Sequence, residues 1–440
     1  MKPDRYYERF GALERQIQRP PGPDLGLIVV IPCFDEIALL DSLESLRACE
    51  PPTCSVEVIV VINSSVTASE QVLRQNRAAL VEGLEWAAGK ADPRFQVFFL
   101  NFPNLPEKHA GVGLARKIGM DEAARRFDDL DRPDGVIVCF DADTACDPNY
   151  LVAIEQHFRE HPCTPGCSIY FEHPLSGPYL SRIYTAITLY ELHLRYYVQA
   201  LRFACFPHAH HTIGSSMAVR AGVYKRQGGM NKRQAGEDFY FLHKIIPLGA
   251  FTDLATTRVI PAPRYSHRVP FGTGKAVGDF LRQGGLKTYP LEAFLDLRQF
   301  VGNILRLGIE AFDQTEPLPP SIVSFLAQKE FSAALEEMRR NCSSKRTFLK
   351  RFFQWFNGFE AMKFVHHARD KFYGEREIPQ EARKLAQLAW PEDGVPSASR
   401  PKDLLLFFRA KVRRLAAASA DRGTLRIPAS LQRPGDQLSV

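Results

Sequence analysis

Apolar and polar positions follow two repeating patterns along the first third of the chain. Continuous apolar runs at 25–33, 56–63, 95–101 and 135–140 are typical of strands buried on both faces of a sheet. The segments between these runs space their apolar residues as helices do, for example Leu39, Leu43 and Leu46. Four strands separated by helices predict a mainly parallel, doubly wound α/β sheet.

The rest of the chain divides into a continuation of this domain and a helical region. The pattern predicts helices at 149–161, 179–206 and 236–249, strands at 167–173 and 251–263, and a strand or loop at 211–220. Beyond about residue 290 the chain becomes helical, aromatic and basic. We therefore expect an N-terminal extension at 1–24, an α/β domain at 25–290, a helical C-terminal region at 291–420 and a flexible tail at 421–440.

Polar residues follow each of the four predicted strands. In chain order they are Asp35 and Glu36, Asn63 to Ser65, Asn101, and Asp141 with Asp143. Because ligands of doubly wound sheets bind outside the carboxyl ends of the strands, these residues predict the rim of a ligand site. Loop residues are usually polar, but this explanation accounts poorly for two acids one residue apart.

The two acids, Asp141 and Asp143, have a natural partner in a metal ion. Neighbouring carboxylates raise the pKa of one another unless a cation lies between them. Their oxygen atoms suit a hard divalent ion such as Mg²⁺ or Mn²⁺, which usually shares its coordination with substrate phosphates. The pair therefore predicts a site for a metal-bound diphosphate.

Composition narrows the class of protein. The 440 residues are 45% hydrophobic and 24% charged, as in an ordinary globular enzyme. The net charge of +6 is scattered, so we expect no nucleic-acid partner. Nine thinly spread cysteines favour reduced thiols. No signal-peptide pattern and no apolar run of membrane-spanning length is present, so we expect a cytoplasmic protein, with a peripheral position at the inner face of the membrane as the alternative.

An ordered set of motifs covering about residues 25 to 260 resembles family 2 of the GT-A-fold glycosyltransferases. The motifs are VVIPCFDE (29–36), VEVIVVINSS (56–65), GVGLARKIGMDEA (111–123), DAD (141–143), GSSMAVR (214–220) and GGMNKRQAGEDFYF (228–241). The resemblance implies the GT-A nucleotide-diphospho-sugar transferase fold, a Rossmann-like mixed sheet, here with a helical C-terminal region. It also implies an inverting, single-addition, hexosyltransferase-type transfer from a nucleotide-sugar donor to an acceptor hydroxyl.

The resemblance also implies roles for individual residues. Asp143 would bind Mn²⁺ or Mg²⁺ directly, and Asp141 would contact the ribose, or the metal through water. Asp238 corresponds to the general base of the family, with Glu237 beside it. Pro32, Phe34 and Glu36 would line the base and ribose pocket, and Arg116 would contact the diphosphate. Asn63 stands near the place of a uracil-binding aspartate of the family, so the base of the donor stays open.

The segment YSHRVPFGTGKA, residues 265–276, adds two candidates. Many GT-A enzymes complete the metal site with a histidine from a loop at this point, which makes His267 a candidate third ligand. Arg268 would close over the diphosphate. A histidine in an ordinary turn beside Pro270 is the alternative.

Several alternatives stay open at this stage. A retaining GT-A enzyme would leave Asp238 without a role as base, and a haloacid-dehalogenase-like phosphatase would use Asp141 as nucleophile, although Ala145 stands where that class has Thr or Val. The acceptor is a saccharide, a lipid-linked molecule or a small molecule, which suits glycan or glycolipid biosynthesis. The basic, apolar segment 403–418 predicts either a peripheral membrane contact or, more simply, a packed helix.

Overall fold

The computed structural model describes residues 5–11, 13–265, 272–312 and 317–420. His267, Arg268 and the expected tail at 421–440 lie outside these residues. The chain forms two compact units, Met1–Leu180 with Thr212–Gly278, and Ser181–His211 with Asp279–Val440. The domain boundaries expected from the sequence stay predictions.

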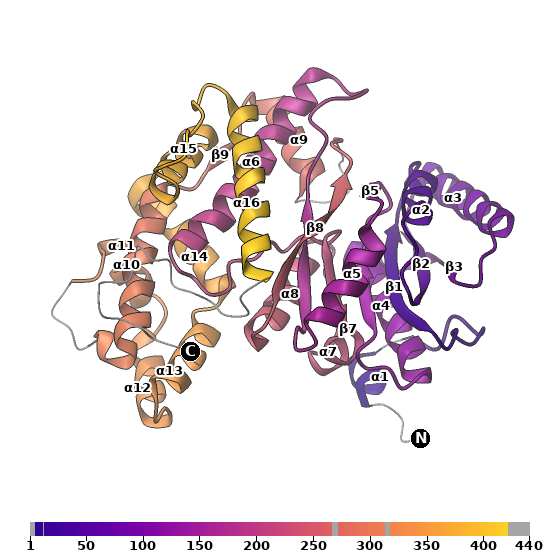
Figure 1. The fold of residues 1–440 in the computed structure, drawn as a ribbon, viewed down its shortest axis with the longest axis horizontal. Helices are drawn as coiled ribbons and strands as arrows, with labels where there is room; N and C mark the ends of the chain where they lie inside the picture. Colours follow the sequence, from indigo (N-terminus) through magenta and orange to yellow (C-terminus); the bar gives the residue numbers. More distant parts are fainter. Residues whose placement is uncertain (1–4, 12, 266–271, 313–316, 421–440) are drawn as a thin grey trace. The chain divides into compact units, whose positions relative to one another are not determined.

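The first unit is built on an eight-stranded mixed sheet with the order β3-β2-β1-β4-β7-β6-β8-β5 (Figure 1). Its first four strands in this order are mutually parallel, and β7 is antiparallel to both β4 and β6. The strands are β1 (Leu25–Cys33), β2 (Ser55–Ser65), β3 (Phe95–Leu105), β4 (Val136–Cys139), β5 (Thr144–Cys146), β6 (Gly166–Phe171), β7 (Met217–Arg220) and β8 (Thr252–Pro261). The expected Rossmann-like mixed sheet is confirmed.

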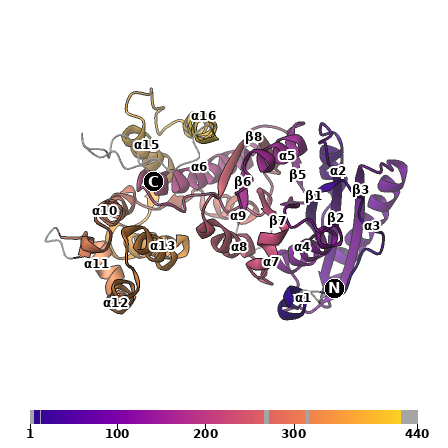
Figure 2. The same cartoon turned by 60° about the horizontal axis from the view of Figure 1, so that its bottom comes forward.

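Helices cover both faces of this sheet. α4 packs on β1 and β2, beside α7, and α3 packs on β2 and β3 (Figure 2). Gly119 lets α4 lie close, because a Cβ atom there would come 2.4 Å from Val30 Cγ1. The helices of this unit are α1 (Arg5–Phe10), α2 (Leu39–Arg47), α3 (Glu70–Gly89), α4 (Val112–Asp129), α5 (Tyr150–Glu160), α7 (Ala221–Arg226), α8 (Glu237–Ile245) and the short η1 (Ile246–Leu248). α9 (Thr273–Gln283) begins in this unit and ends in the second.

The sequence located most of these elements. β1 has the predicted bounds, and β2, β3, β4, β6 and β8 begin within one residue of their predicted starts. The three-residue strand β5 and the helix α9 were not predicted. β5 is too short to carry a period, and it is extended because it pairs with β8, more than 100 residues further along the chain.

The second unit is helical. Its aromatic core includes Phe300, Phe352 and Phe356, whose side chains are buried. The elements are α6 (Ser181–Phe203), β9 (Lys287–Thr288), α10 (Leu291–Leu307), η2 (Gly308–Phe312), α11 (Pro320–Ala327), α12 (Phe331–Asn341), α13 (Lys345–Trp355), α14 (Gly358–Ala368), η3 (Arg369–Tyr373), β10 (Arg376–Glu377), α15 (Ile378–Ala389) and α16 (Pro401–Ala420). The expected helical C-terminal region is confirmed.

α16 covers the segment for which the sequence left a membrane contact open. Its apolar residues Leu404, Leu405 and Phe408 are fully buried, and the helix packs on α6. Arg409 donates hydrogen bonds of 2.7 and 2.8 Å to the buried carboxylate of Glu191 on α6. Within the described part of the chain, no helix has both the length and the apolar character needed to cross a membrane.

His157 on α5 generates a prediction about stability and pH. Its Nε2 lies 2.7 Å from Thr252 Oγ1 on β8, and burial, with the nearby His161, lowers the pKa of His157 to about 4. Between pH 6.5 and about 4, His157 is therefore protonated in the unfolded chain but neutral in the folded chain. We expect the contribution of His157 to stability to fall as the pH drops from 6.5 towards 4, by up to ~1.4 kcal/mol per pH unit.

The measurement is the melting temperature between pH 7 and 4 for the wild type and for His157→Gln, whose amide keeps a polar partner for Thr252 but does not titrate. The variant should lose less stability on acidification than the wild type. His109→Gln, at a partly exposed histidine, is the matched control and should behave like the wild type. Parallel acid profiles for wild type and His157→Gln would contradict the prediction.

Candidate active site

Three parallel strands bring the predicted polar rim to one edge of the sheet. Val30 of β1 pairs with Ile59 of β2 and with Cys139 of β4, so the carboxyl ends of the three strands lie side by side. Asp35 and Glu36 follow β1, Asn63 to Ser65 close β2, and Asp141 with Asp143 follow β4. The register of the sheet therefore gathers residues as far apart in the sequence as Asp35 and Asp143.

Arg116 on α4 joins two of the predicted acids. Its guanidinium donates one hydrogen bond of 2.7 Å to Asp141 and a second, short one to Glu237. The Arg116 side chain is only 2% exposed, and Nε is buried without a hydrogen-bond partner. The two carboxylates hold the pKa of Arg116 above its ordinary value although burial opposes the charge, so this arginine is a fixed cation.

Three glycines allow the chain to close around this arginine. A Cβ atom at Gly113 would come 2.1 Å from the carbonyl oxygen of Arg233, and one at Gly111 would come 2.9 Å from Gln234 Cα. At Gly214 a Cβ atom would come 2.7 Å from the guanidinium of Arg116. The glycines of the 111–123 and 214–220 motifs thus serve close packing between α4, the segment before β7 and the loop before α8.

Glu237 and Asp238 occupy the first turn of α8, which Gly236 enters with a positive φ of 69°. Burial raises the pKa of Glu237 to about 7, against the opposing charge of Arg116. Burial also raises the pKa of Asp238, whose Oδ1 accepts a hydrogen bond of 2.7 Å from the backbone N–H of Phe239. A half-buried carboxylate with a raised pKa accepts a proton more readily than one in water, as a general base must.

Asp143 and Glu36 share a second arginine, Arg264. Its Nε donates to Asp143 at 2.8 Å, and its Nη2 forms an ion pair with each of the two carboxylates. Glu36 is 2% exposed, and its Oε1 accepts hydrogen bonds from the backbone N–H groups of Ile37 and Ala38 before α2. Burial raises the pKa of Asp143, while Arg264 opposes this shift.

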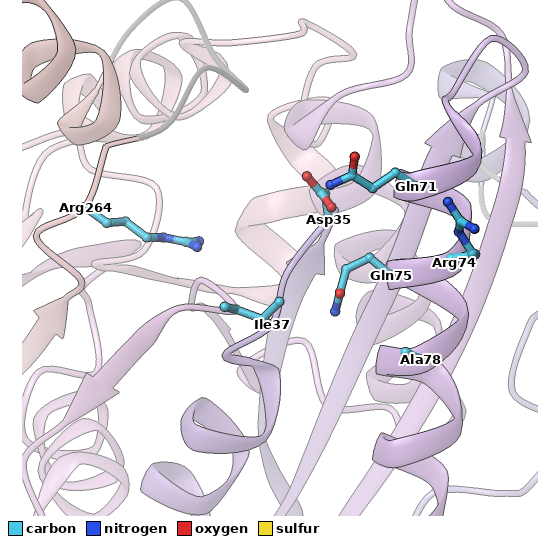
Figure 3. A pocket seen from close by; sticks show the side chains of 7 residues that line it. All are labelled: Asp35, Ile37, Gln71, Arg74, Gln75, Ala78 and Arg264. Atoms are coloured by element: carbon cyan, nitrogen blue, oxygen red, sulfur yellow. The ribbon is translucent and has the colours of Figure 1, made fainter.

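A pocket of about 460 Å³ opens beside Arg264. Four of its residues, Gln71, Arg74, Gln75 and Ala78, come from one face of α3, as Figure 3 shows. They share that face because their spacing follows the helical repeat. The remaining lining residues are Asp35, Ile37 and Arg264.

Hydrogen bonds from α3 fix the loop that borders this pocket. Asn76 accepts a hydrogen bond from the backbone N–H of Asp35 at 2.9 Å and donates one to the carbonyl oxygen of Asn63 at 3.0 Å. Gln75 donates to the carbonyl oxygen of Glu36 at 3.0 Å. Asn63 itself is 3% exposed and contributes to this order through its backbone.

The structure thus brings most of the predicted residues to one edge. Asp141 and Glu237 pair with Arg116, and Asp143 and Glu36 pair with Arg264. Asp238 follows Glu237 in the first turn of α8, and Pro32 and Phe34 are partly buried near the end of β1. His267 and Arg268 lie outside the described residues. Sequence reasoning missed Arg264 and the polar face of α3. The i, i+3, i+4, i+7 spacing of residues 71, 74, 75 and 78 could have predicted that face. No pattern in the sequence around Arg264 indicates that this residue belongs to the site.

The donor set at this edge suits a hard divalent ion that shares its coordination with a ligand. Asp141 and Asp143 offer carboxylate oxygens, the ligands that Mg²⁺ and Mn²⁺ prefer. Among the described residues no group of three or more His, Cys, Asp or Glu side chains forms a complete metal cage. Such ions commonly take one or two carboxylates and complete their shell with water and phosphate oxygens, so two acids fit this use.

Comparison with known proteins gives a family match for part of the chain. Residues 28–228 match the model for Glycosyl transferase family 2. The crystal structure of S. aureus TarS 1-349 is similar over 89% of this chain and 92% of that chain, with 13% identity and a TM-score of 0.36. The crystal structure of S. aureus TarS 1-349 in complex with UDP-GlcNAc is similar over 91% of this chain and 92% of that chain, with 15% identity and a TM-score of 0.36. TM-scores this low transfer no feature of TarS to this chain, and no curated protein sequence matches it.

The mixed sheet with its acid-lined edge and the family match define the class of protein: the chain is a glycosyltransferase with a GT-A-like α/β domain. Residues 28–228 form a family 2 glycosyltransferase domain, as the sequence motifs predicted. The phosphatase alternative is therefore set aside.

The close approach at Gly113 generates a prediction about packing. In Gly113→Ala the new methyl group would meet the carbonyl oxygen of Arg233 and the Cβ atom of Glu237. We expect a loss of ~1–3 kcal/mol in the free energy of unfolding, the usual cost of overpacking, despite the better helix propensity of alanine. Thermal unfolding with matched circular dichroism checks this.

Gly89→Ala is the matched control, because a Cβ atom at this helical glycine of α3 meets nothing within 4 Å. It should be neutral or slightly stabilising. A Gly113→Ala protein that melts at or above the wild-type temperature would show that α4 and the loop before α8 are not packed as described.

Proposed function

We propose that the protein transfers a single sugar from a nucleotide-sugar donor to an acceptor hydroxyl, with inversion at the anomeric carbon and with the help of Mn²⁺ or Mg²⁺. One observation carries the proposal. Arg116 links Asp141, on the expected donor side, to Glu237, the neighbour of the expected base Asp238. This contact supports the proposal, because the groups that we assign to the leaving diphosphate and to proton acceptance would then lie close together at the sheet edge.

The pocket beside α3 suits the nucleoside part of such a donor. Its volume of about 460 Å³ falls in the range of ordinary small-ligand sites. Gln71, Gln75, Arg74 and Asp35 offer donors and acceptors for base edges and ribose hydroxyls, and Ile37, 79% exposed, offers an apolar surface. Pro32, Phe34, Glu36 and Asn63 form or order the adjoining strand ends. This composition does not select one base.

Asp141 and Asp143 would hold the divalent ion. When bound together with the donor, the ion supplies Lewis-acid neutralisation of the negative charge on the departing nucleoside diphosphate. We also propose Arg264 for the diphosphate, because its guanidinium already lies at Asp143 and borders the pocket. His267 as a third ligand and Arg268 as a diphosphate contact stay proposals, since both lie outside the described residues.

Asp238 would act on the acceptor. Its carboxylate takes the proton from the acceptor hydroxyl while that oxygen forms a bond to the anomeric carbon. The bond from that carbon to the diphosphate oxygen breaks on the opposite face, and its electron pair leaves with the diphosphate. The raised pKa of Asp238 suits this role, because burial makes the carboxylate more basic than one in water.

Arg116 and Glu237 would position these groups. The guanidinium of Arg116 is buried and pairs with two carboxylates, so we propose that it orients Asp141 and α8. This role differs from the diphosphate contact that the family resemblance implied for Arg116. Glu237 neutralises this arginine, and its carbonyl oxygen accepts a hydrogen bond from Asn231 that holds the start of α8.

Acceptor, location and stereochemistry are proposed more broadly. The acceptor is a saccharide, a lipid-linked molecule or a small molecule, and the protein works in the cytoplasm. A peripheral membrane contact through 403–418 would use the basic residues of α16 together with its exposed Leu406 and Leu415, since Leu404, Leu405 and Phe408 are buried. A retaining transfer is the alternative, and it would leave Asp238 without a proton to accept.

Asp143→Ala tests the metal role by isothermal calorimetry with UDP and GDP, each with Mn²⁺ and with EDTA. Loss of partners that merely support a metal ligand costs 10–100-fold in affinity, so loss of a ligand should weaken the Mn²⁺-dependent binding by ~100-fold or more. Asp129→Ala, at an acid paired with Arg15 far along α4, is the control and should bind normally. Undiminished Mn²⁺-dependent binding in Asp143→Ala would refute the role.

Asp238→Asn tests the base. We expect turnover in donor hydrolysis, with water as the acceptor, to fall by ~10²-fold while the affinity for the nucleoside diphosphate stays unchanged. Proton NMR of the sugar released by the wild type reports the configuration of its anomeric carbon. Near-normal turnover in Asp238→Asn, or a sugar of retained configuration, would rule out Asp238 as the base of an inverting transfer.

A further inference from the structure

Two free cysteines meet beside the sheet edge. Cys49 lies just after α2, and Cys146 is the last residue of β5. Their Sγ atoms are 3.6 Å apart, although the residues are 97 positions apart in the sequence. Neither residue has a role in the proposed transfer.

Ser45 holds both thiols in this arrangement. The backbone N–H of Cys146 donates to Ser45 Oγ at 2.9 Å, and the same Oγ lies 3.5 Å from Cys146 Sγ. The Cys49 thiol donates to the carbonyl oxygen of Ser45 at 3.4 Å. Because an α2 residue contacts both cysteines, the fold itself sets their separation. A disulfide needs the sulfurs at about 2.05 Å, so each sulfur has to move by less than about 1 Å.

We propose that Cys49 and Cys146 form a reversible intramolecular disulfide when the protein meets a peroxide. The thiolate of Cys49 attacks one oxygen of hydrogen peroxide, the O–O bond breaks, and hydroxide leaves to give a sulfenic acid. The sulfur of Cys146 then attacks this sulfenic sulfur, the S–O bond breaks, and water leaves. Two thiols and one peroxide give one disulfide and two waters, and a dithiol reductant reverses the change.

The surroundings of Cys49 suit the role of the attacking sulfur, whereas the hydrogen bond with Cys49 and burial raise the pKa of Cys146, which is the protonated partner of the pair. The hydrogen bond with Cys146 lowers the pKa of Cys49, which favours a thiolate there. Cys49 is 9% exposed and Cys146 is partly exposed, so a molecule as small as hydrogen peroxide can reach the pair. The nearby Cys54 differs, because burial and Glu155 raise the pKa of its thiol to about 12.

The bond would tie together two segments that carry site residues. β5 begins directly after Asp143, and α2 follows the turn capped by Glu36. A cross-link between the end of α2 and β5 would therefore restrain both acids that Arg264 bridges. It would also close a loop of about 97 residues, which lowers the entropy of the unfolded chain.

The test uses the full-length wild-type protein, treated with hydrogen peroxide and then with an alkylating agent. Tryptic digestion should yield a cross-linked pair of peptides, 48–74 with 127–159, about two mass units lighter than the two reduced peptides together. Dithiothreitol should abolish the link. The oxidised protein should melt several degrees above the reduced protein.

Variants assign the link, because peptide 48–74 also contains Cys54 and peptide 127–159 also contains Cys139. The link should persist in Cys54→Ser and in Cys139→Ser and disappear in Cys49→Ser and in Cys146→Ser. A link that survives in the last two variants, a pair oxidised only to sulfinic acid, or an oxidised protein that melts below the reduced one would overturn the proposal. The wild-type measurement stands without any variant, so a variant that fails to fold does not remove the test.

Discussion

The active-site edge depends on one buried cation, the guanidinium of Arg116. Asp141 and Glu237 are brought together from the end of a strand and the start of a helix, and without a counter-charge their approach would be unfavourable. Arg116 can reach both because the glycines at 111, 113 and 214 let three chain segments come into contact around it. The proposed donor side and the proposed acceptor side are therefore linked through a single side chain that has almost no contact with solvent.

The second arginine is of a different kind. Arg264 is 20% exposed, borders the pocket and bridges Asp143 and Glu36, whereas Arg116 is only 2% exposed. A ligand diphosphate or a metal ion that reaches Asp143 must therefore exchange with an existing ion pair rather than enter a set of unpaired acids. The net gain of binding is smaller than the bare attraction would suggest, since one favourable contact replaces another.

The sequence predicted the parallel half of the sheet and most of the acids, because apolar strand runs and strand-end motifs are local signals. It could not predict the partners of those acids. Arg264 pairs with Asp143, 121 positions away, and with Glu36, 228 positions away, and no local pattern encodes such a pairing. The sequence pattern did not predict β5 for the same reason, since its three residues are extended only because β8 lies beside them. The diphosphate role suggested for Arg116 rested on its motif, and only tertiary packing revealed how deeply that side chain is buried.

The ion pair between Glu191 and Arg409 has a consequence for biosynthesis. Its two members are 218 residues apart, and α6 belongs to a unit whose other segment begins at Asp279. At usual ribosome speeds of about 5–20 residues per second, the synthesis of α16 follows that of α6 after on the order of 10–40 s. During that interval its apolar face and the carboxylate of Glu191 lack their final cover. The nascent chain therefore passes through a stage in which α6 lacks its packing against α15 and α16.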